Sequence, residues 1–209
     1  MFSLALDKYS TLANKMKKEL GDRSYPIWLL VNPNNLAVCH DIWAPILDEI
    51  QDKIYRKLHT RIDPENIFVK NTVSDIGIVS KTSNCWATEV SEEVIMLRES
   101  VQEYQPKILI TFGALTNEFV KRVLETRSSE GPKYWSTTNL EDEFERSIEN
   151  FDINQMNRVP IPLLRRVMKS GKSVEDRNYS SWEESENYLR YLGTKIAGRI
   201  IENKDSLKI

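Results

Sequence analysis

Cysteine and histidine are scarce in this chain, which has two of each among its 209 residues. Cys39 and Cys85 belong to no Cys-x-x-Cys pair, and His40 and His59 lack the spacing of metal ligands. Both absences argue against a zinc site and against a disulfide framework. We therefore expect no bound metal, and we expect the two thiols to stay reduced in the cytoplasm.

The sequence also lacks long apolar runs and the motifs of common enzyme sites. No run approaches the roughly 18 apolar residues of a membrane-spanning helix. The early charges at Asp7 and Lys8 do not fit a secretory signal, so no membrane partner is expected. Neither a G-x-G-x-x-G fingerprint nor a G-x-S-x-G elbow occurs, which argues against dinucleotide binding and serine hydrolysis. The formal net charge of -2 argues neither for nor against a nucleic-acid partner.

One apolar run lies between two turn-forming segments. Residues 27–31 read Ile-Trp-Leu-Leu-Val, with no polar face, which is typical of a strand covered on both sides. Asn32, Pro33 and Asn34 follow directly. Because a residue before proline is disfavoured in the helical region, we expect Asn32 at the carboxyl end of this strand. Ligands bind there in open α/β sheets, although an ordinary polar turn is the alternative.

Strands and helices are predicted to alternate along the chain. Apolar runs predict strands at 67–72 and 107–113, and the alternate prolines of 158–163 predict a short or edge strand. Helical periodicity recurs at 2–20, 41–58 (with Asp41 as its cap), 90–104, 115–124 and 181–200. This alternation predicts an α/β fold whose parallel strands are joined by crossover helices. Residues 1–209 are expected to form one domain, with a surface insertion at about 127–157 that holds a short acidic helix.

Asparagine, glycine and basic side chains follow the predicted strands. Asn71 lies at the end of the second strand and Gly113 at the end of the third. A carboxamide offers an acceptor and two donors and can pair with a base edge, with discrimination of about 1–3 kcal/mol. Asn71 is therefore predicted to bind a nucleobase, or else to be a turn residue that bonds its own backbone. Around and after the fourth strand lies a basic cluster that would contact phosphate or form a solvated helix face: Arg158, Arg165, Arg166, Lys169 and Lys172.

Three segments resemble the uracil-DNA glycosylase superfamily in their order: LLVNPNN (29–35), NIFVKNTVSD (66–75) and QPKILITFGALTNEFV (105–120). The first is similar to a motif in which an apolar strand ends in Asn-Pro-Gly, and the second to the strand whose Asn binds the base. The resemblance implies a three-layer α/β/α sandwich around a mostly parallel, four-stranded sheet. It also implies hydrolysis of the bond between base and deoxyribose in DNA, as in DNA repair, without a cofactor and after base flipping.

Carried over position by position, the resemblance assigns roles to individual residues. Asn32 would be the catalytic residue that holds the attacking water. Residues 160–164 would form the loop that wedges into the DNA strand. Contacts with the substrate are implied for five positions: Asn34, Asn71, Gly113, Pro160 and Leu163.

Two positions differ from the pattern of that family. Asn34 replaces a glycine, and Val159 or Pro160 stands where a histidine would stabilise the departing base anion. An amide can orient water but is a poor base, so hydrolysis would be slow. Two other functions stay open: a non-catalytic interaction module on the same fold, and an enzyme that acts on a small nucleotide or sugar.

Overall fold

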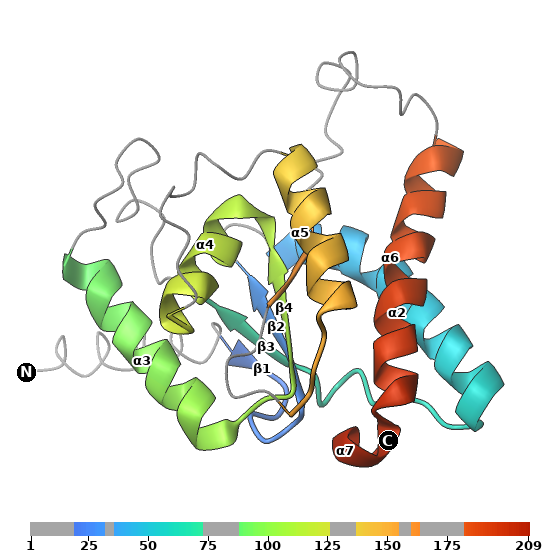
Figure 1. The fold of residues 1–209 in the computed structure, drawn as a ribbon, viewed down its shortest axis with the longest axis horizontal. Coiled ribbons are helices and arrows are strands. Elements are labelled where there is room, and N and C mark those ends of the chain that lie inside the picture. Colours follow the sequence, from blue (N-terminus) through green and yellow to red (C-terminus); the bar gives the residue numbers. More distant parts are fainter. Residues whose placement is uncertain (1–18, 32–35, 73–87, 126–136, 155–159, 164–181) are drawn as a thin grey trace, which may run out of the picture.

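The structure, a computed structural model, describes residues 19–31, 36–72, 88–125, 137–154, 160–163 and 182–209. These residues form a mixed α/β fold around a single sheet (Figure 1). Its elements, in chain order, are β1 (Glu19–Leu20), β2 (Ile27–Val31), α2 (Leu36–Leu58), β3 (Phe68–Asn71), α3 (Thr88–Tyr104), β4 (Ile108–Phe112), α4 (Gly113–Val123), α5 (Thr137–Glu149), β5 (Ile161–Leu163), α6 (Trp182–Glu202) and α7 (Lys204–Leu207).

The sheet has five strands in the order β1-β3-β2-β4-β5. β3, β2, β4 and β5 are parallel, as the alternation of strands and helices predicts. β2 and β4 lie in the middle, and all ten of their residues are buried, which explains why their sequences have no polar face. The prediction of a mostly parallel sheet is confirmed, but the predicted number of four strands omits β1.

β1 corrects the predicted helix over residues 2–20, whose last two residues form a strand antiparallel to β3. The turn after β1 requires glycine, because Gly21 has a φ of +80° and a Cβ there would lie 2.1 Å from the carbonyl oxygen of Ile67. The pairing partner and this tight turn, rather than local periodicity, determine the conformation of Glu19 and Leu20. Residues 2–18 of the predicted helix lie outside the described residues.

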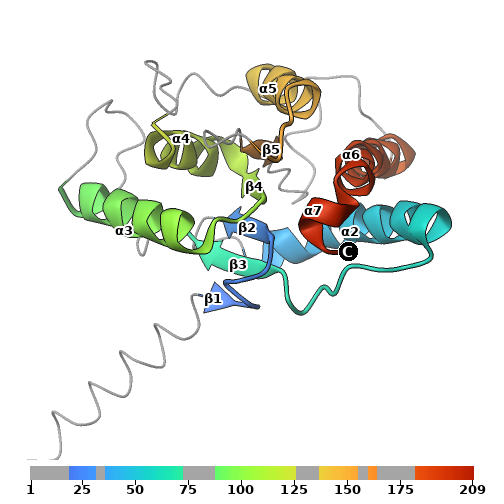
Figure 2. The same ribbon diagram turned by 60° about the horizontal axis from the view of Figure 1, so that its bottom comes forward.

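Helices cover both faces of the sheet, as Figure 2 shows with the sheet seen nearly edge-on. On one side, called here the α2 face, Leu29 of β2 and Ile110 of β4 belong to a core completed by α2 and α6. The helical periodicity predicted for residues 41–58 is confirmed, since Ile46, Ile50 and Ile54 are fully buried there. The sequence predicts this helix because these apolar residues recur at the spacing that places them on one face.

The opposite side of the sheet, called here the α4 face, is covered by α3 and α4. Trp28 and Leu30 of β2 pack there against Leu97 of α3 and Phe119 of α4. Strand residues alternate between the two faces, because successive side chains of a strand point in opposite directions. This alternation decides on which face each polar residue near the strand ends lies.

The start of α2 differs from the prediction. Asp41 is predicted to cap this helix, but α2 begins at Leu36 and continues through Pro45. A proline inside a helix removes one backbone hydrogen bond. Ile42 and Ile46 are buried on either side of Pro45, and their packing against the sheet offsets this loss.

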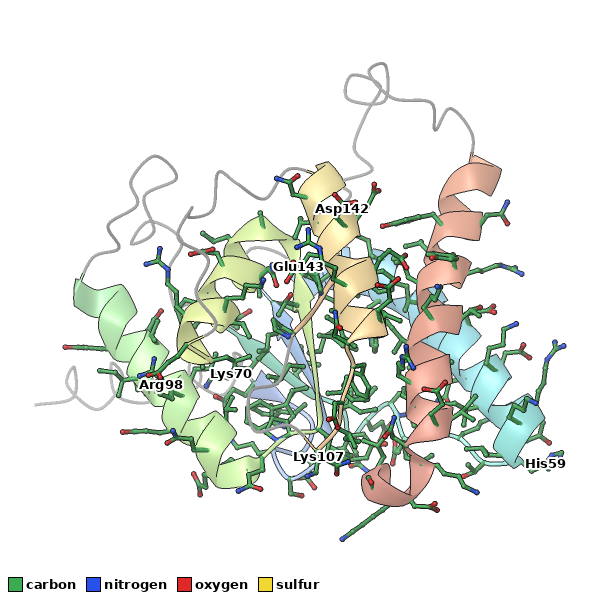
Figure 3. The ribbon with its side chains drawn as sticks, in the orientation of Figure 1. His59, Lys70, Arg98, Lys107, Asp142 and Glu143 are labelled. Carbon is green, nitrogen blue, oxygen red and sulfur yellow. The ribbon has the colours of Figure 1, made fainter. Side chains whose placement is uncertain are left out.

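α5 lies within the range predicted as a surface insertion, 127–157, and its apolar side chains enter the core. Phe144 and Ile148 are buried in the same cluster as the α2 face of the sheet. Glu143 is also largely buried and forms an ion pair with Lys121 of α4. α5 therefore belongs to the packed body of the molecule, although exposed charges such as Asp142 remain on its outer side (Figure 3).

β5 matches its prediction as a short edge strand. It has three residues, pairs only with β4 among the described strands, and includes Pro162 opposite Thr111. A proline has no N–H to donate to a second neighbour, which confines it to an edge. Among the described residues, no helix combines the length and the apolar character needed to cross a membrane.

Candidate nucleobase site at the carboxyl edge

The carboxyl ends of four parallel strands meet at one edge of the sheet. Val31 of β2 pairs with Asn71 of β3, and Phe112 of β4 pairs with Leu163 of β5. Leu30 pairs with Thr111, so Phe112 is level with Val31. We call this row of strand ends the carboxyl edge. Lys107, labelled in Figure 3, precedes β4 and lies at the opposite, amino edge.

The strand order places a topological switch point between β2 and β4. After β2, α2 packs on one face and leads to β3; after β4, α4 packs on the other face. The two connections therefore diverge and leave the ends of β2 and β4 side by side. In open α/β sheets, ligands bind outside the carboxyl ends of the strands at such a point.

Asn71 occupies the carboxyl edge beside β2, as the sequence predicts. Its side chain is half-buried, and its Oδ1 atom is buried without a hydrogen-bond partner among the described residues. The alternative prediction, a turn asparagine that bonds its own backbone through this oxygen, has no such bond in the described structure. A buried acceptor without a donor costs about 1–3 kcal/mol. Such a group indicates a missing donor at the carboxyl edge.

Thr72 fixes the backbone position of Asn71. The Thr72 amide donates to the carbonyl oxygen of Val31 over 2.8 Å, and the Thr72 hydroxyl donates to the same oxygen over 3.1 Å. Both bonds are buried, where water does not compete for them. The end of β3 is thereby tied to the end of β2, and the position of Asn71 relative to the switch point is fixed.

A charged network lies beside Asn71, and its charged side chains pair with one another. Lys70 and Arg23 both form ion pairs with Glu19. Burial raises the pKa of Glu19, but hydrogen bonds and charge attraction from Lys70 and Arg23 outweigh this effect, so its pKa lies below the ordinary value. Lys70 shares the α4 face with Phe68, whereas Asn71 shares the α2 face with Val69. The network stabilises β1 and does not direct a charge at Asn71.

The junction of β4 and α4 forms the other side of the switch point. α4 begins at Gly113 directly after the strand, and Gly113 is buried with a φ of +80°, a conformation that favours glycine. Phe112 is the N-cap residue and supplies no side-chain hydrogen bond. The first N–H groups of a helix lack partners within the helix, so this end of α4 presents uncapped donors.

Polar side chains that the sequence analysis did not single out lie under α4. We call Thr111, Thr116, Asn117 and Glu118 the α4 polar cluster; each is 1% exposed or less. The Thr111 hydroxyl donates to Oδ1 of Asn117 over 3.4 Å, and Glu118 pairs with Arg122 over 3.0 Å. The Thr116 hydroxyl and Nδ2 of Asn117 have no partner among the described residues.

A signal for this cluster is visible in the sequence in retrospect. The triplet Thr116-Asn117-Glu118 follows a buried strand and a glycine and lies within two helical turns of the strand end. Three consecutive helical residues cover more than half of the helix circumference, so some of them must face the sheet. The apolar stripe of Leu115 and Phe119 alone gave no reason to expect all three polar residues to be buried.

Pro160 and Leu163 lie in a different setting from the one that the resemblance implies. Both are buried, Pro160 just before β5 and Leu163 at its end, and Leu163 belongs to the core of the α2 face. The register with β4 fixes Leu163 as part of the sheet, and Pro160 lies one residue before the paired segment. Residues 161–163 of the predicted DNA-wedging loop over 160–164 form this strand, residue 164 lies outside the described range, and the wedging role stays a prediction.

The structure brings together only part of the predicted site. Asn71 and Gly113 both lie at the carboxyl edge, Asn71 at the end of β3 and Gly113 just beyond the end of β4. Asn71 projects on the α2 face, whereas Thr111 and its partner Asn117 lie on the α4 face. Seven predicted site residues lie outside the described residues: Asn32, Asn34, Arg158, Arg165, Arg166, Lys169 and Lys172.

No group of three or more His, Cys, Asp or Glu side chains within the described ranges could hold a metal ion. The chemistry that these residues offer is hydrogen bonding by amides, hydroxyls and helix N–H groups. Such groups bind and orient a polar ligand, and they supply no strong base.

No protein-family model matches the chain, and no curated protein matches it. The resemblance to the uracil-DNA glycosylase superfamily stays a prediction from three short segments.

Proposed function

We propose that the carboxyl edge binds a nucleobase presented in DNA, and that Asn71 pairs with the edge of the base. The observation that carries this proposal is the buried Oδ1 atom of Asn71, which has no donor among the described residues and lies one strand from the switch point. On this proposal, the parallel strands with helices on both faces correspond to the three-layer α/β/α sandwich, with four parallel strands, that the resemblance implies.

A nucleobase suits the chemistry of Asn71. Its unsatisfied Oδ1 accepts a hydrogen bond, and an imide or amino N–H of a base supplies the missing donor. The same carboxamide can donate to a neighbouring carbonyl of the base through Nδ2, which gives the bidentate pairing typical of amide side chains with bases. Such a pair contributes about 1–3 kcal/mol of discrimination between bases.

Hydrolysis on this proposal is slow. Asn32 would orient a water whose oxygen forms a bond to C1′ of the sugar and whose proton passes to solvent, while the bond from C1′ to the base breaks and the base leaves with the electron pair. A carboxamide cannot take up the proton of that water at neutral pH, and no histidine follows Arg158 to stabilise the leaving base anion. The proposal therefore predicts clear binding and little turnover.

The test uses oligonucleotides that contain a single uracil or a mismatch, compared with a fully matched duplex. We expect retention of the uracil- or mismatch-containing strand at low salt, binding that weakens steeply with added salt, and few abasic sites. Asn71→Ala should lower the affinity about 5- to 150-fold, which corresponds to the loss of one base pairing. Asn66→Ala is the matched control, because Asn66 precedes the same strand at the amino edge. Equal binding by both variants, or no binding by the natural chain, would contradict the proposal.

A non-catalytic interaction module is the second candidate. It is favoured by the burial of Pro160 and Leu163, because a strand in the core cannot wedge into DNA. In that case Asn71→Ala leaves the partner bound, whereas a base-binding site loses its ligand.

The third function, an enzyme for a small nucleotide or sugar, predicts that a free nucleotide raises the melting temperature while oligonucleotides do not. A ligand at 100 times its dissociation constant adds about 2.7 kcal/mol to stability.

A further inference from the structure

The unsatisfied groups on the two sides of the switch point differ in their hydrogen-bonding character. On β3, Oδ1 of Asn71 is an acceptor that lacks a donor. On α4, Nδ2 of Asn117 is a donor, the Thr116 hydroxyl can donate, and the first N–H groups of the helix are donors without a side-chain cap. A ligand that satisfies both sides must present an N–H group at one end and several acceptor oxygens at the other.

We propose that the ligand is a nucleotide, with its phosphate held by the first turn of α4 together with Thr116 and Asn117. This inference rests on the proposed function, because it uses Asn71 to bind the base. A phosphate offers several acceptor oxygens and carries the negative charge that a helix N-terminus favours. α4 is 11 residues long and has no acidic residue in its first turn, so no carboxylate of its own competes for that position.

The two buried side chains support the helix end as a site. Side chains of an α-helix lean towards its N-terminus and cover the preceding turn. Thr116 and Asn117 therefore lean towards the turn that begins at Gly113. The bond between Asn117 and Thr111 agrees with this direction, because Thr111 lies on β4 two residues before α4. Both side chains are almost fully buried, so a phosphate there would be shielded from water, where hydrogen bonds are stronger.

The charges around the helix end allow an anion to bind. Glu118 is the acidic residue of the α4 polar cluster, and its charge is paired with Arg122 over 3.0 Å. Lys121 of the next turn is paired with Glu143 of α5. The site is therefore made of neutral donors and the helix dipole rather than of basic side chains. Such a site suits the phosphate group of a nucleotide, which is compact and would be partly desolvated there.

The separation of the two sides excludes a base alone as the complete ligand. Asn71 lies on β3 and α4 follows β4, with β2 between them, so the strands that carry the two sides are about 10 Å apart, at two inter-strand spacings. The side chain of Asn71 also projects on the α2 face, whereas Thr116 and Asn117 lie on the α4 face, so a single base ring cannot contact both sides. A base joined through its sugar to a phosphate contacts both only by passing over the end of β2 at the carboxyl edge. Because Thr116 and Asn117 are covered, the chain around them must move to admit the ligand, so association should be slower than about 10⁵ M⁻¹s⁻¹.

The experiment compares four probes by calorimetry: deoxyuridine, deoxyuridine 5′-monophosphate, an oligonucleotide with one internal deoxyuridine, and inorganic phosphate. We expect the monophosphate to bind at least about tenfold more tightly than the nucleoside, because its phosphate adds one charge-assisted hydrogen bond. Thr116→Val should abolish most of that gain and leave nucleoside affinity unchanged. This variant should fold, because it replaces an unpartnered buried hydroxyl with a methyl group. Thr194→Val, at an exposed position of α6, is the matched control.

The outcomes separate this inference from the proposed function. If nucleoside and monophosphate bind equally well, and Asn71→Ala weakens both, the base site stands and the phosphate site is refuted. If none of the probes binds, both are refuted. A gain for the monophosphate that Thr116→Val leaves intact also refutes the inference. Where the phosphate site is supported, tighter binding of the oligonucleotide than of the monophosphate identifies DNA as the source of the phosphate, and the reverse order identifies a free nucleotide.

Discussion

Two glycines of α6 have opposite surroundings and give a direct test of helix packing. A Cβ at Gly193 would lie 2.8 Å from both the carbonyl oxygen of Ile46 and the Cβ of Glu49 on α2. Gly193→Ala should therefore force α2 and α6 apart, at a cost of about 1–3 kcal/mol. The better helix propensity of alanine offsets about 1 kcal/mol of this. Urea unfolding should accordingly report a net loss of up to about 2 kcal/mol.

Gly198→Ala is the matched control for Gly193→Ala, because a Cβ at Gly198 meets no atom within 4 Å. The same substitution on the same helix should there stabilise the protein by up to about 1 kcal/mol, through helix propensity alone. If both variants change the free energy of unfolding by the same amount, the close contact between α2 and α6 is not present.

Glu19 provides a prediction about pH. Its pKa lies below the ordinary value in the folded chain, because Lys70 and Arg23 outweigh the effect of burial. A lowered folded-state pKa means that Glu19 stabilises the fold above its unfolded-state pKa, and that this stabilisation is lost as the pH falls through the folded-state pKa. Compared by urea unfolding, the natural chain should be more stable than Glu19→Gln at neutral pH. The difference should vanish in acid; a difference independent of pH would contradict the ion pairs at β1.

At the scale of elements, the sequence predicts those whose signal is local. β2 and β4 are continuous apolar runs, and the stripes of α2 and α3 recur at helical spacing, so their positions could be predicted closely. β1 could not, because two residues carry no periodicity and their conformation depends on pairing with β3. The start of α2 was also missed, since the packing of Ile42 and Ile46 overrides the local signals of Asp41 and Pro45.

The ion pair between Lys121 and Glu143 joins α4 to α5 and is largely buried, with side chains 14% and 9% exposed. Removing one partner from such a pair weakens the compensation of the remaining charge, which costs up to about 3–5 kcal/mol for buried pairs. Glu143→Leu should therefore destabilise the protein by about 3 kcal/mol, the lower end of that range, because Lys121 keeps some exposure and Arg146 loses a contact of only 3.6 Å. Thermal or urea unfolding measures this loss.

The double variant Lys121→Met with Glu143→Leu is the control for this pair. An apolar pair of similar size removes both charges together, so it should recover most of the stability lost in Glu143→Leu. If the double variant is as unstable as the single one, the side chain of Glu143 contributes through packing rather than through its charge.

At the scale of the whole molecule, the strand order determines where a ligand can bind. The sequence predicts that Asn71 and Gly113 follow strands, and parallel strands place them at one edge. It does not predict on which face each side chain lies, because that depends on the register and on the helix that follows each strand. The burial of Thr116 and Asn117 could not be predicted for the same reason: it depends on α4 packing directly against the sheet after Gly113.

Nuclear magnetic resonance of the ¹⁵N-labelled chain tests the central claim most directly, by titration with a single-stranded oligonucleotide that contains one deoxyuridine. The account predicts shifts of the Asn71 side-chain amide and of the backbone amides of Thr72 and Gly113, with no shift at Lys107 of the amino edge. In Asn71→Ala, the shift at Thr72 should require a higher oligonucleotide concentration. Shifts confined to the amino edge, or a titration that leaves the carboxyl edge unchanged, would contradict the account.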